Sequence, residues 1–342
     1  MSENPREGGA GPSPGRSGPS VARAGAAGGL LPLPLATLLA VFLALFLAFA
    51  LTTPYFLTAE NLLNMARQMA PDLLVGVTMT LVITTGGIDL SVGSLLALSG
   101  SVAALLMQAG WSWQLASLLV LALGAGVGLI HGYVVAVQRI PPFIVTLATL
   151  SALEGLALYL TNGYSIPVTS SAFDALGQGW ILGLPVPAVL AVLALLAGAL
   201  VLNRTRTGLH ITAIGANEES VRRAGVNVVA TKVWVYVASS VATALAGLIV
   251  VARLSTGSAD VGSTFELDVI AAVVLGGTNL FGGEGTMLGT FLGTLIIAMV
   301  TNALILLHVQ PALTQVAEGI IILGAILGNE KILAWQRSRR TG

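Results

Sequence analysis

The sequence predicts an all-α, polytopic integral membrane protein with about ten transmembrane helices, some of them short and broken, and with both termini in the cytoplasm. Three observations lead to this class. First, 55% of the 342 residues are hydrophobic and only 9% are charged. A soluble domain carries roughly 25% charged residues, so a soluble enzyme is excluded. Second, the length accommodates roughly ten spans of about 20 apolar residues each. Third, the basic residues fall almost entirely on one side of the resulting arrangement.

Apolar segments follow one another along residues 30–330, the expected transmembrane domain. Proline, glycine or polar residues bound each segment: the first ends before Pro54, and Pro141-Pro142 precede the fifth. The eighth has only about seven apolar residues and is too short to cross a bilayer unaided. The ten expected spans cover approximately 33–53, 69–85, 90–108, 113–137, 143–160, 186–202, 233–252, 269–275, 285–307 and 313–327.

The distribution of basic residues tests this arrangement. Residues 1–29 have the Gly-, Pro- and Ser-rich composition of a disordered cytoplasmic tail, and 331–342 form a basic cytoplasmic tail. With the N-terminus inside, every Lys and Arg except Arg67 and Arg253 falls in a tail or a cytoplasmic loop, as the positive-inside rule requires. The largest group lies in the loop 203–232. Without the eighth segment the C-terminal basic cluster would lie outside, which favours ten spans.

Several absences exclude other functions. The chain has no cysteine, hence no disulfide and no thiolate metal site. Its only lysines, Lys232 and Lys331, are not part of a Gly-Lys-Ser/Thr motif, so a phosphate-binding P-loop is absent. Zero net charge argues against a nucleic-acid partner. The three scattered histidines predict no metal site or cofactor and are expected to be isolated helix-end or loop residues: His131, His210 and His308.

A glycine-rich motif occurs twice. Residues 86–93 and 276–283 share the frame Gly-Gly-x-(Asp/Asn)-Leu-x-x-Gly, with Asp89 in the first copy and Asn279 in the second. Paired, glycine-interrupted segments point to a transport site between structural repeats. Two ordinary glycine-rich turns between helices are the alternative interpretation. The residues of the motif that are expected along a substrate pathway are Gly86, Gly87, Asp89, Ser91, Gly276, Gly277 and Asn279.

The cytoplasmic loop contains the signals of a two-turn helix. Asn217 is a suitable N-cap, acidic residues occupy the first turn and basic residues the last, and Gly225 suits the left-handed position after the helix. So short a helix would not persist alone in water, so we expect it to dock against a cytoplasmic partner. A connector whose arginines only fix topology is the alternative. The predicted docking residues are Asn217, Glu218, Glu219, Val221, Arg222, Arg223, Ala224 and Gly225.

Acidic residues within or beside apolar segments are candidates for function, although each could instead support helix packing. Glu154 lies deepest, about midway along the fifth span, and Asp268 opens the short eighth segment. Both join the expected substrate pathway. The whole set is Asp72, Asp89, Glu154, Glu266, Asp268 and Glu318.

Recurring glycines indicate close helix packing rather than a substrate. They crowd the fourth span at Gly124, Gly126 and Gly128 and recur at Gly285, Gly289 and Gly293.

Three motifs in order resemble the ribose-type ABC importer permeases, the membrane subunits of bacterial monosaccharide uptake systems. They are GGIDLSVGS at 86–94, the segment from Ala213 to Val228, and FELDVIAAVVLGGT at 265–278, and the resemblance covers about 33–328. It implies a multi-pass permease in the bacterial inner membrane, paired as a homodimer or heterodimer. A cytoplasmic ATP-binding subunit and an extracytoplasmic solute-binding protein would be its partners. The family's coupling segment falls on Ala216–Asn227, and Gly87–Ser91 favours the sugar branch over branched-chain amino-acid permeases.

The chain departs from the sugar branch at three acids. Glu154, Glu284 and Glu318 stand where members of that branch often carry a basic residue. These positions leave open both the solute and whether the dimer pairs identical subunits.

The leading hypothesis is therefore a non-catalytic permease that translocates a monosaccharide or similar small polar solute, driven by a separate ATPase subunit. An ABC permease for a branched-chain amino acid, a nucleoside or a signalling molecule is an alternative. An ion-coupled secondary transporter would instead use Asp89, Glu154 and Asp268 to carry protons or sodium. An integral-membrane enzyme would need clustered histidines or paired catalytic acids, which the sequence does not display.

Overall fold

The computed structural model describes residues 33–310, 313–314, 316 and 319–320. The predicted tails 1–29 and 331–342, most of the predicted tenth span and Glu318 lie outside the described residues.

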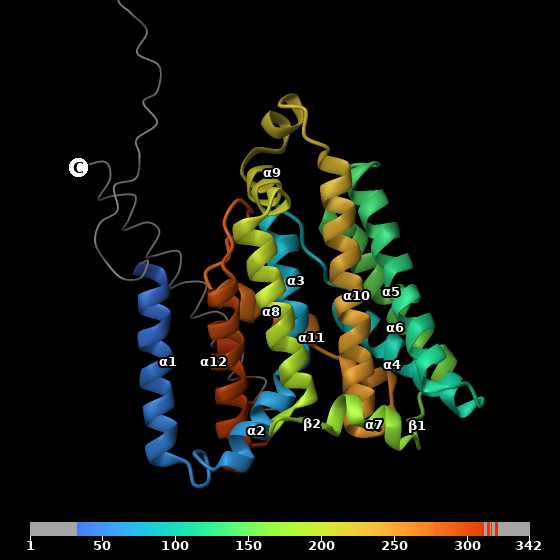
Figure 1. Cartoon of the computed structure of the whole chain (residues 1–342), viewed down its shortest axis with the longest axis vertical. Helices are drawn as coiled ribbons and strands as arrows, with labels where there is room; N and C mark the ends of the chain where they lie inside the picture. Colours follow the sequence, from blue (N-terminus) through green and yellow to red (C-terminus); the bar gives the residue numbers. More distant parts are fainter. Residues whose placement is uncertain (1–32, 311–312, 315, 317–318, 321–342) are drawn as a thin grey trace, which may run out of the picture. The chain divides into compact units, whose positions relative to one another are not determined.

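The described chain is mainly helical (Figure 1). Nine expected spans coincide with helices to within a few residues at each end, apart from longer N-termini in α10 and α11. The helices are α1 (Leu33–Thr52), α2 (Ala59–Gln68), α3 (Ala70–Thr84), α4 (Val92–Gln108), α5 (Trp113–Ala136), α6 (Pro142–Thr161), α7 (Ser171–Gln178), α8 (Val186–Arg204), α9 (Arg206–Arg223), α10 (Val228–Leu254), α11 (Phe265–Leu275) and α12 (Met287–Leu306), with a 3-10 helix η1 (Ala259–Gly262).

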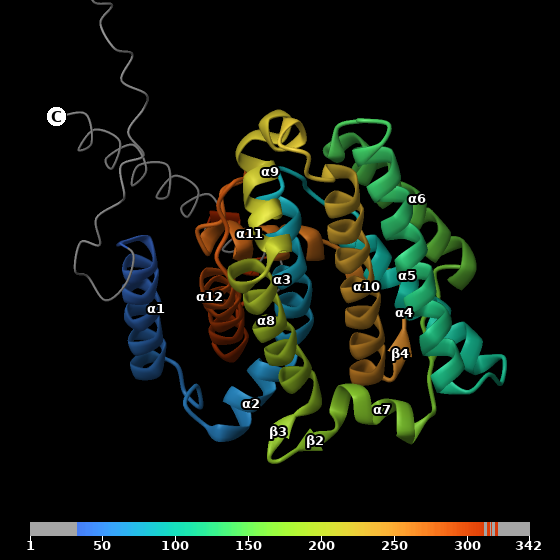
Figure 2. The same cartoon turned by 45° about the horizontal axis from the view of Figure 1, so that its top comes forward.

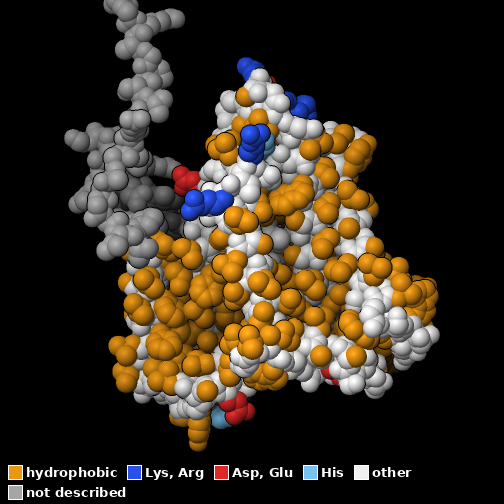
Figure 3. Space-filling view, viewed as in Figure 1, with side chains coloured by type: hydrophobic (Ala, Val, Ile, Leu, Met, Phe, Trp, Pro, Cys, Tyr) orange, Lys and Arg blue, Asp and Glu red, His pale blue; other side chains and the backbone are white. Residues whose placement is uncertain are grey.

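Length and composition support a polytopic membrane protein. Within the described residues, α1, α5, α6, α8, α10 and α12 are each long and apolar enough to cross a membrane, and α3 and α4 are shorter apolar helices. Figure 3 shows hydrophobic side chains over the middle of one face and basic side chains gathered at the end where α9 lies. The best-exposed spans are α1, α6 and α8, whose most apolar windows are only 6%, 17% and 22% buried, as expected of helices that face lipid.

Helices α2, α7 and most of α9 were not expected, because none of them is a long apolar run. The side chain of Thr58 caps α2 by accepting a hydrogen bond from the Asn61 amide at 3.3 Å. Two pairs of short antiparallel strands lie in the loops near α7. Strand β1 (Ile166–Pro167) pairs antiparallel with β4 (Thr256–Gly257), and β2 (Trp180–Ile181) forms a hairpin with β3 (Leu184–Pro185).

Two helices form the centre of the packing. In α3 every residue except Asp72 and Thr78 is buried, and this helix contacts α8, α10, α11 and α12. The most apolar window of α10 is 78% buried, and this helix packs on α3, α4 and α5. Helices α5 and α10 run side by side in both views (Figures 1 and 2).

Glycine makes the α5–α10 contact possible. A Cβ atom at Gly128 would lie 2.5 Å from Val237 Cα, and one at Gly132 would lie 2.6 Å from Val233 Cα. Gly124 faces the same helix, so the packing stripe recurs every four residues along one side of α5. The predicted packing role is confirmed for Gly124 and Gly128. It is wrong for Gly126, which has nothing within 4 Å of its Cβ position, because two residues turn a helix to another face.

The close packing predicted for Gly285, Gly289 and Gly293, at and before the start of α12, is also present in the structure. A Cβ atom at Gly289 would overlap the carbonyl oxygen of Gly276, and one at Gly293 would overlap that of Ala272, both at or next to the end of α11. Gly285 faces the hydroxyl of Thr84 at the end of α3. The start of α12 is therefore held directly against α11.

The α5 stripe predicts different effects for two neighbouring substitutions. Gly128→Ala forces a methyl group into the backbone of α10 and should lower stability by about 1–3 kcal/mol, the usual cost of overpacking. Gly126→Ala, the matched control, meets open space and should leave stability equal or higher, because alanine favours helix. Thermal unfolding of the purified protein in detergent measures both. Equal melting temperatures for the two variants would contradict the assigned packing.

Candidate functional site

The two glycine-interrupted segments, far apart in sequence, touch each other. The first break, residues 85–91, joins α3 to α4, and the second, residues 276–286, joins α11 to α12. The amide of Gly283 donates a hydrogen bond to the carbonyl oxygen of Thr84 at 2.9 Å. A Cβ atom at Gly282 would lie 2.8 Å from the amide nitrogen of Gly86. The two breaks therefore meet backbone to backbone at the end of α3.

Helix α9 reaches the same point. A Cβ atom at Gly215 would overlap the carbonyl oxygen of Thr84 and the amide nitrogen of Gly283, so only glycine fits there. The Cβ position of Gly282 is also 3.0 Å from Gly215 Cα. We call these residues, Thr84, Gly86, Gly215, Gly282 and Gly283, the glycine junction. Any displacement of α9 at Gly215 acts directly on both breaks.

The predicted two-turn helix follows the junction as the second part of α9. Asn217 has an extended backbone, with φ −163° and ψ 93°, so α9 bends there. Its side-chain oxygen accepts a hydrogen bond from the Ser220 amide at 2.9 Å, and Gly225 has φ +82°. These contacts confirm the predicted N-cap and the left-handed residue after the helix.

Ion pairs hold this second part of α9 in place. Glu218 pairs with Arg222 at 2.5 Å and with Lys232 in the first turns of α10 at 2.6 Å, while Glu219 pairs with Arg223 at 2.9 Å. Partial burial disfavours the charged form of the Glu218 carboxyl and by itself would raise its pKa. The Lys232 ammonium and the Arg222 guanidinium outweigh that effect and hold the pKa of the Glu218 carboxyl below its ordinary value. The Lys232 pair joins this second part of α9 to the long helix α10.

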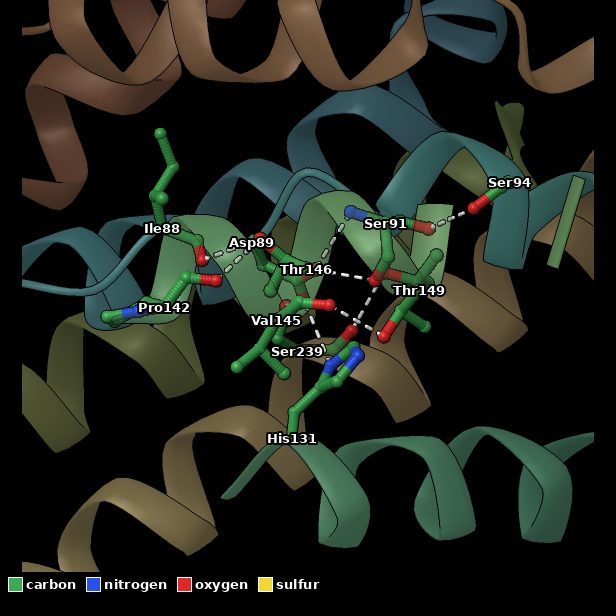
Figure 4. Close-up of polar contacts among 11 residues, drawn as sticks. Ile88, Asp89, Ser91, Ser94, His131, Pro142, Val145, Thr146, Thr149 and Ser239 are labelled. Atoms are coloured by element: carbon green, nitrogen blue, oxygen red, sulfur yellow. Dashed lines mark hydrogen bonds and ion pairs between the residues drawn. The ribbon is translucent and has the colours of Figure 1, made fainter. Parts of the chain in front are cut away.

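Asp89 in the first break is fully buried and accepts hydrogen bonds from different elements. Its Oδ1 accepts the amide of Ser91 at 3.0 Å and the Ser91 hydroxyl at 2.7 Å, and its Oδ2 accepts the hydroxyl of Ser239 on α10 at 3.3 Å (Figure 4). The hydroxyl of Thr146 on α6 also donates to the carbonyl of Ile88 at 3.4 Å. The break is thus attached to α6 and α10.

His131 is a site residue that the sequence did not predict. It was expected at a helix end or in a loop, but it is fully buried in α5, and its Nδ1 lies 4.0 Å from Oδ2 of Asp89 (Figure 4). The Tyr236 ring lies edge-on to it, with centroids 6.0 Å apart. Among the described residues neither ring nitrogen has a hydrogen-bond partner. Its only sequence signal is a histidine within an apolar span, which is equally typical of a packed core position.

Hydrogen bonds within the second break close its turn. The side-chain oxygen of Asn279 accepts a hydrogen bond from the backbone amide of Phe281 at 3.0 Å, and the backbone amide of Asn279 donates to the carbonyl of Glu284 at 3.0 Å. Asn279 therefore stabilises its own turn, whereas Asp89 connects its break to neighbouring helices.

Glu154 and Asp268 lie apart from the junction, each in a different cavity. Glu154, exposed on α6, lines a cavity of about 150 Å³ with Asp260 and Glu266. Asp268, in the first turn of α11, lines a cavity of about 190 Å³ with Asp72 and Arg253. Within the described ranges no group of three or more His, Asp or Glu side chains could hold a metal ion.

Comparisons with known proteins agree on one family. The family model of the branched-chain amino acid transport system / permease component matches residues 61–326. The ribose import permease protein RbsC of Escherichia coli strain K12 is 41% identical over 283 residues, which cover 82% of this chain and 88% of the relative. RbsC of Bacillus subtilis strain 168 is 42% identical, with the same shares covered. The xylose transport system permease protein XylH of E. coli K12 is 33% identical and covers 86% of this chain and 91% of the relative. No solved structure matches the chain.

The Asp89 network predicts a loss of stability when its acceptor is removed. Asp89→Ala leaves the buried donors of Ser91 and Ser239 without a partner and should cost at least about 2–3 kcal/mol, since each buried unsatisfied group costs ~1–3 kcal/mol. Asp260→Ala removes an exposed carboxylate outside the network and should change stability by less than about 0.5 kcal/mol. Thermal unfolding in detergent measures the stability of both variants. Similar losses of stability in Asp89→Ala and Asp260→Ala would show that the Asp89 network does not stabilise the fold.

The Glu218 pairs predict a specific pH dependence. Because the folded pKa of Glu218 is lowered, its stabilisation is fully present above its unfolded pKa of about 4.3 and is lost as the pH falls through the folded pKa. Hydrogen exchange of residues 217–224, corrected for intrinsic rates, should show more protection in the wild type than in Glu218→Gln, with a constant difference from about pH 8 to about pH 5. Glu219→Gln, which loses one exposed pair, is the control and should change protection little. A difference that changes between pH 8 and pH 5 would disprove the pairing.

Proposed function

This chain belongs to the family of permease components of branched-chain amino acid transport systems, and from that membership we propose that it is the membrane subunit of an ABC importer for a monosaccharide. The relatives that carry the names of ribose and xylose permeases support a sugar as the solute. The subunit does not hydrolyse ATP itself. A separate ATP-binding subunit supplies the energy at the cytoplasmic face.

The glycine junction is the observation that carries this proposal. ATP binding moves the docking helix at 217–225, and that motion passes through Gly215 to both breaks at once. Backbone groups in direct contact leave no compressible side chain between them, so a shift at one is felt at the others. The coupling residues are Asn217, Glu218, Glu219, Val221, Arg222, Arg223, Ala224 and Gly225.

The proposed topology places α9 and both termini in the cytoplasm, with ten spans in residues 30–330. The basic residues at the α9 end of the molecule support this orientation. Exposed aromatic residues in the connections assigned to the outer face support the positions of the span ends, because Tyr and Trp favour the membrane interfaces. They are Tyr55, Trp111, Tyr164 and Trp180.

In this proposal the two breaks act as hinges beside the pathway. Gly86, Gly87, Gly276 and Gly277 supply the flexible backbone. Asp89 and Ser91 are fully buried, so they hold the first hinge, and Asn279 holds the second. The acids that face open cavities, Glu154 and Asp268, meet the solute.

The full importer would contain a second permease, identical or different, and an extracytoplasmic solute-binding protein in a bacterial inner membrane. The binding protein selects the solute, so the membrane pathway binds it weakly. No cofactor is needed by the permease.

Reconstitution with the ATP-binding subunit and the solute-binding protein tests the coupling. Gly225→Pro should abolish ATP-driven sugar uptake, because proline cannot adopt the positive φ of +82° at the end of the docking helix. Gly110→Pro imposes the same misfit at φ +86° in the α4–α5 connection and should retain uptake. Wild-type uptake rates in Gly225→Pro would refute the coupling role. Uptake without any ATP-binding subunit would establish a secondary transporter instead.

A further inference from the structure

A polar cavity of about 190 Å³ lies among five helices, α2, α3, α10, α11 and α12. Its charged residues come from three of them: Asp72 in the first turn of α3, Asp268 in the first turn of α11 and Arg253 in the last turn of α10. Polar side chains of α2 and α12 also line the cavity, including Gln68, Thr301 and Asn302, the last of which is hydrogen-bonded to Asn61. Charges inside a membrane domain are costly and are kept where they serve a function.

The backbone stabilises these charges in place. Each carboxylate lies at the N-terminal, positive end of its helix, and the guanidinium lies at the C-terminal, negative end of α10. Asp72 attracts Arg253, and Arg67 of α2 lies close enough to repel it. Two carboxylates and two guanidinium groups therefore lie in or beside the cavity, and their charges balance.

Apolar side chains also line the cavity. They are Met65, Met69, Ile297 and Ala298. A pocket that combines hydrogen-bond donors and acceptors with apolar surface matches a molecule that carries both hydroxyl and C–H groups.

The position of the cavity connects it to the hinges. Asp72 and Asp268 begin α3 and α11, the two helices that end at the first and second breaks. A molecule in the cavity therefore touches the start of both helices whose far ends meet at the glycine junction.

We propose that this cavity is a solute subsite within each permease subunit, selective for a neutral polyhydroxylated molecule of monosaccharide size. The inference rests on the proposed function. Because the nearby charges balance, an anion finds no net positive charge to compensate it, so sugar phosphates and sugar acids are disfavoured. Amide, hydroxyl, carboxylate and guanidinium groups exchange hydrogen bonds with sugar hydroxyls.

The absence of cysteine makes a direct test possible, because one introduced thiol is then the only one in the chain. Ala298→Cys places a thiol on the part of α12 that lines the cavity, and Ala59→Cys places a control thiol at an exposed position of α2, outside the cavity. Each variant is reconstituted with the ATP-binding subunit in proteoliposomes that expose the outer face. The rate of labelling by a small, membrane-impermeant thiol reagent is then measured with and without ribose.

Ribose should slow labelling of Ala298→Cys and leave that of Ala59→Cys unchanged. At about nine times the dissociation constant, about 90% of the cavities are filled and labelling slows about tenfold. Ribose 5-phosphate should give no protection. Combining Ala298→Cys with Asp268→Asn should weaken the protection of the thiol by ribose. Combining it with Glu60→Gln, an exposed acid-to-amide change on α2, should leave that protection unchanged.

Two results overturn the inference. One is a thiol at 298 that the reagent cannot reach, because a cavity that admits a sugar admits a reagent of similar size. The other is labelling that neither ribose nor xylose slows. Ile297→Cys provides a second position of α12 that lines the cavity if Ala298→Cys impairs folding. Wild-type uptake is assayed in parallel: uptake without protection refutes only the subsite, whereas no ATP-driven uptake refutes the proposed function.

Discussion

Unwound backbone inside a membrane domain must find its hydrogen bonds within the protein, and much of this structure follows from how two breaks meet that requirement. Each break frees backbone groups at a helix end. The chain places the breaks against each other, so the Gly283 amide is satisfied by the last carbonyl of α3. That arrangement brings three backbone segments into direct contact, which excludes side chains at Gly215 and at its neighbours. The same constraint that satisfies the backbone therefore also links α9 to both breaks.

The two breaks share a sequence frame but are stabilised differently. Asn279 uses its side chain to close its own turn. Asp89 is buried and gathers donors from its own loop and from α10, with His131 of α5 beside it. A carboxylate in a buried position is costly unless donors surround it, so the first break is tied to surrounding helices that the second does not need. If the first break moves, either α10 moves with it or the hydrogen bond between Ser239 and Asp89 is lost.

The sequence predicted local features well, because hydropathy and capping are local. The span boundaries, the Asn217 cap and the left-handed Gly225 all depend on residues within a few positions of each other. It could not predict contacts between distant segments. The glycine junction, the burial of His131 against Asp89 and the separation of Glu154 from Asp268 depend on which helices pack together. The Gly126 error has the same origin, since counting glycines in a span does not identify the face that meets α10.

Helix α10 connects the docking helix, the first break and the polar cavity. At its start, Lys232 of α10 pairs with Glu218 of the docking helix. Along its length, Ser239 donates to Asp89 in the first break, and at its end Arg253 lines the polar cavity. At 27 residues α10 is about 40 Å long, enough to span the hydrocarbon core. Because α10 is mostly buried and packs on α3, α4 and α5, bending it would disturb its contacts with all three helices. Under the proposed coupling, a displacement of the docking helix would reach the first break by two routes, the backbone contact at Gly215 and the helix α10.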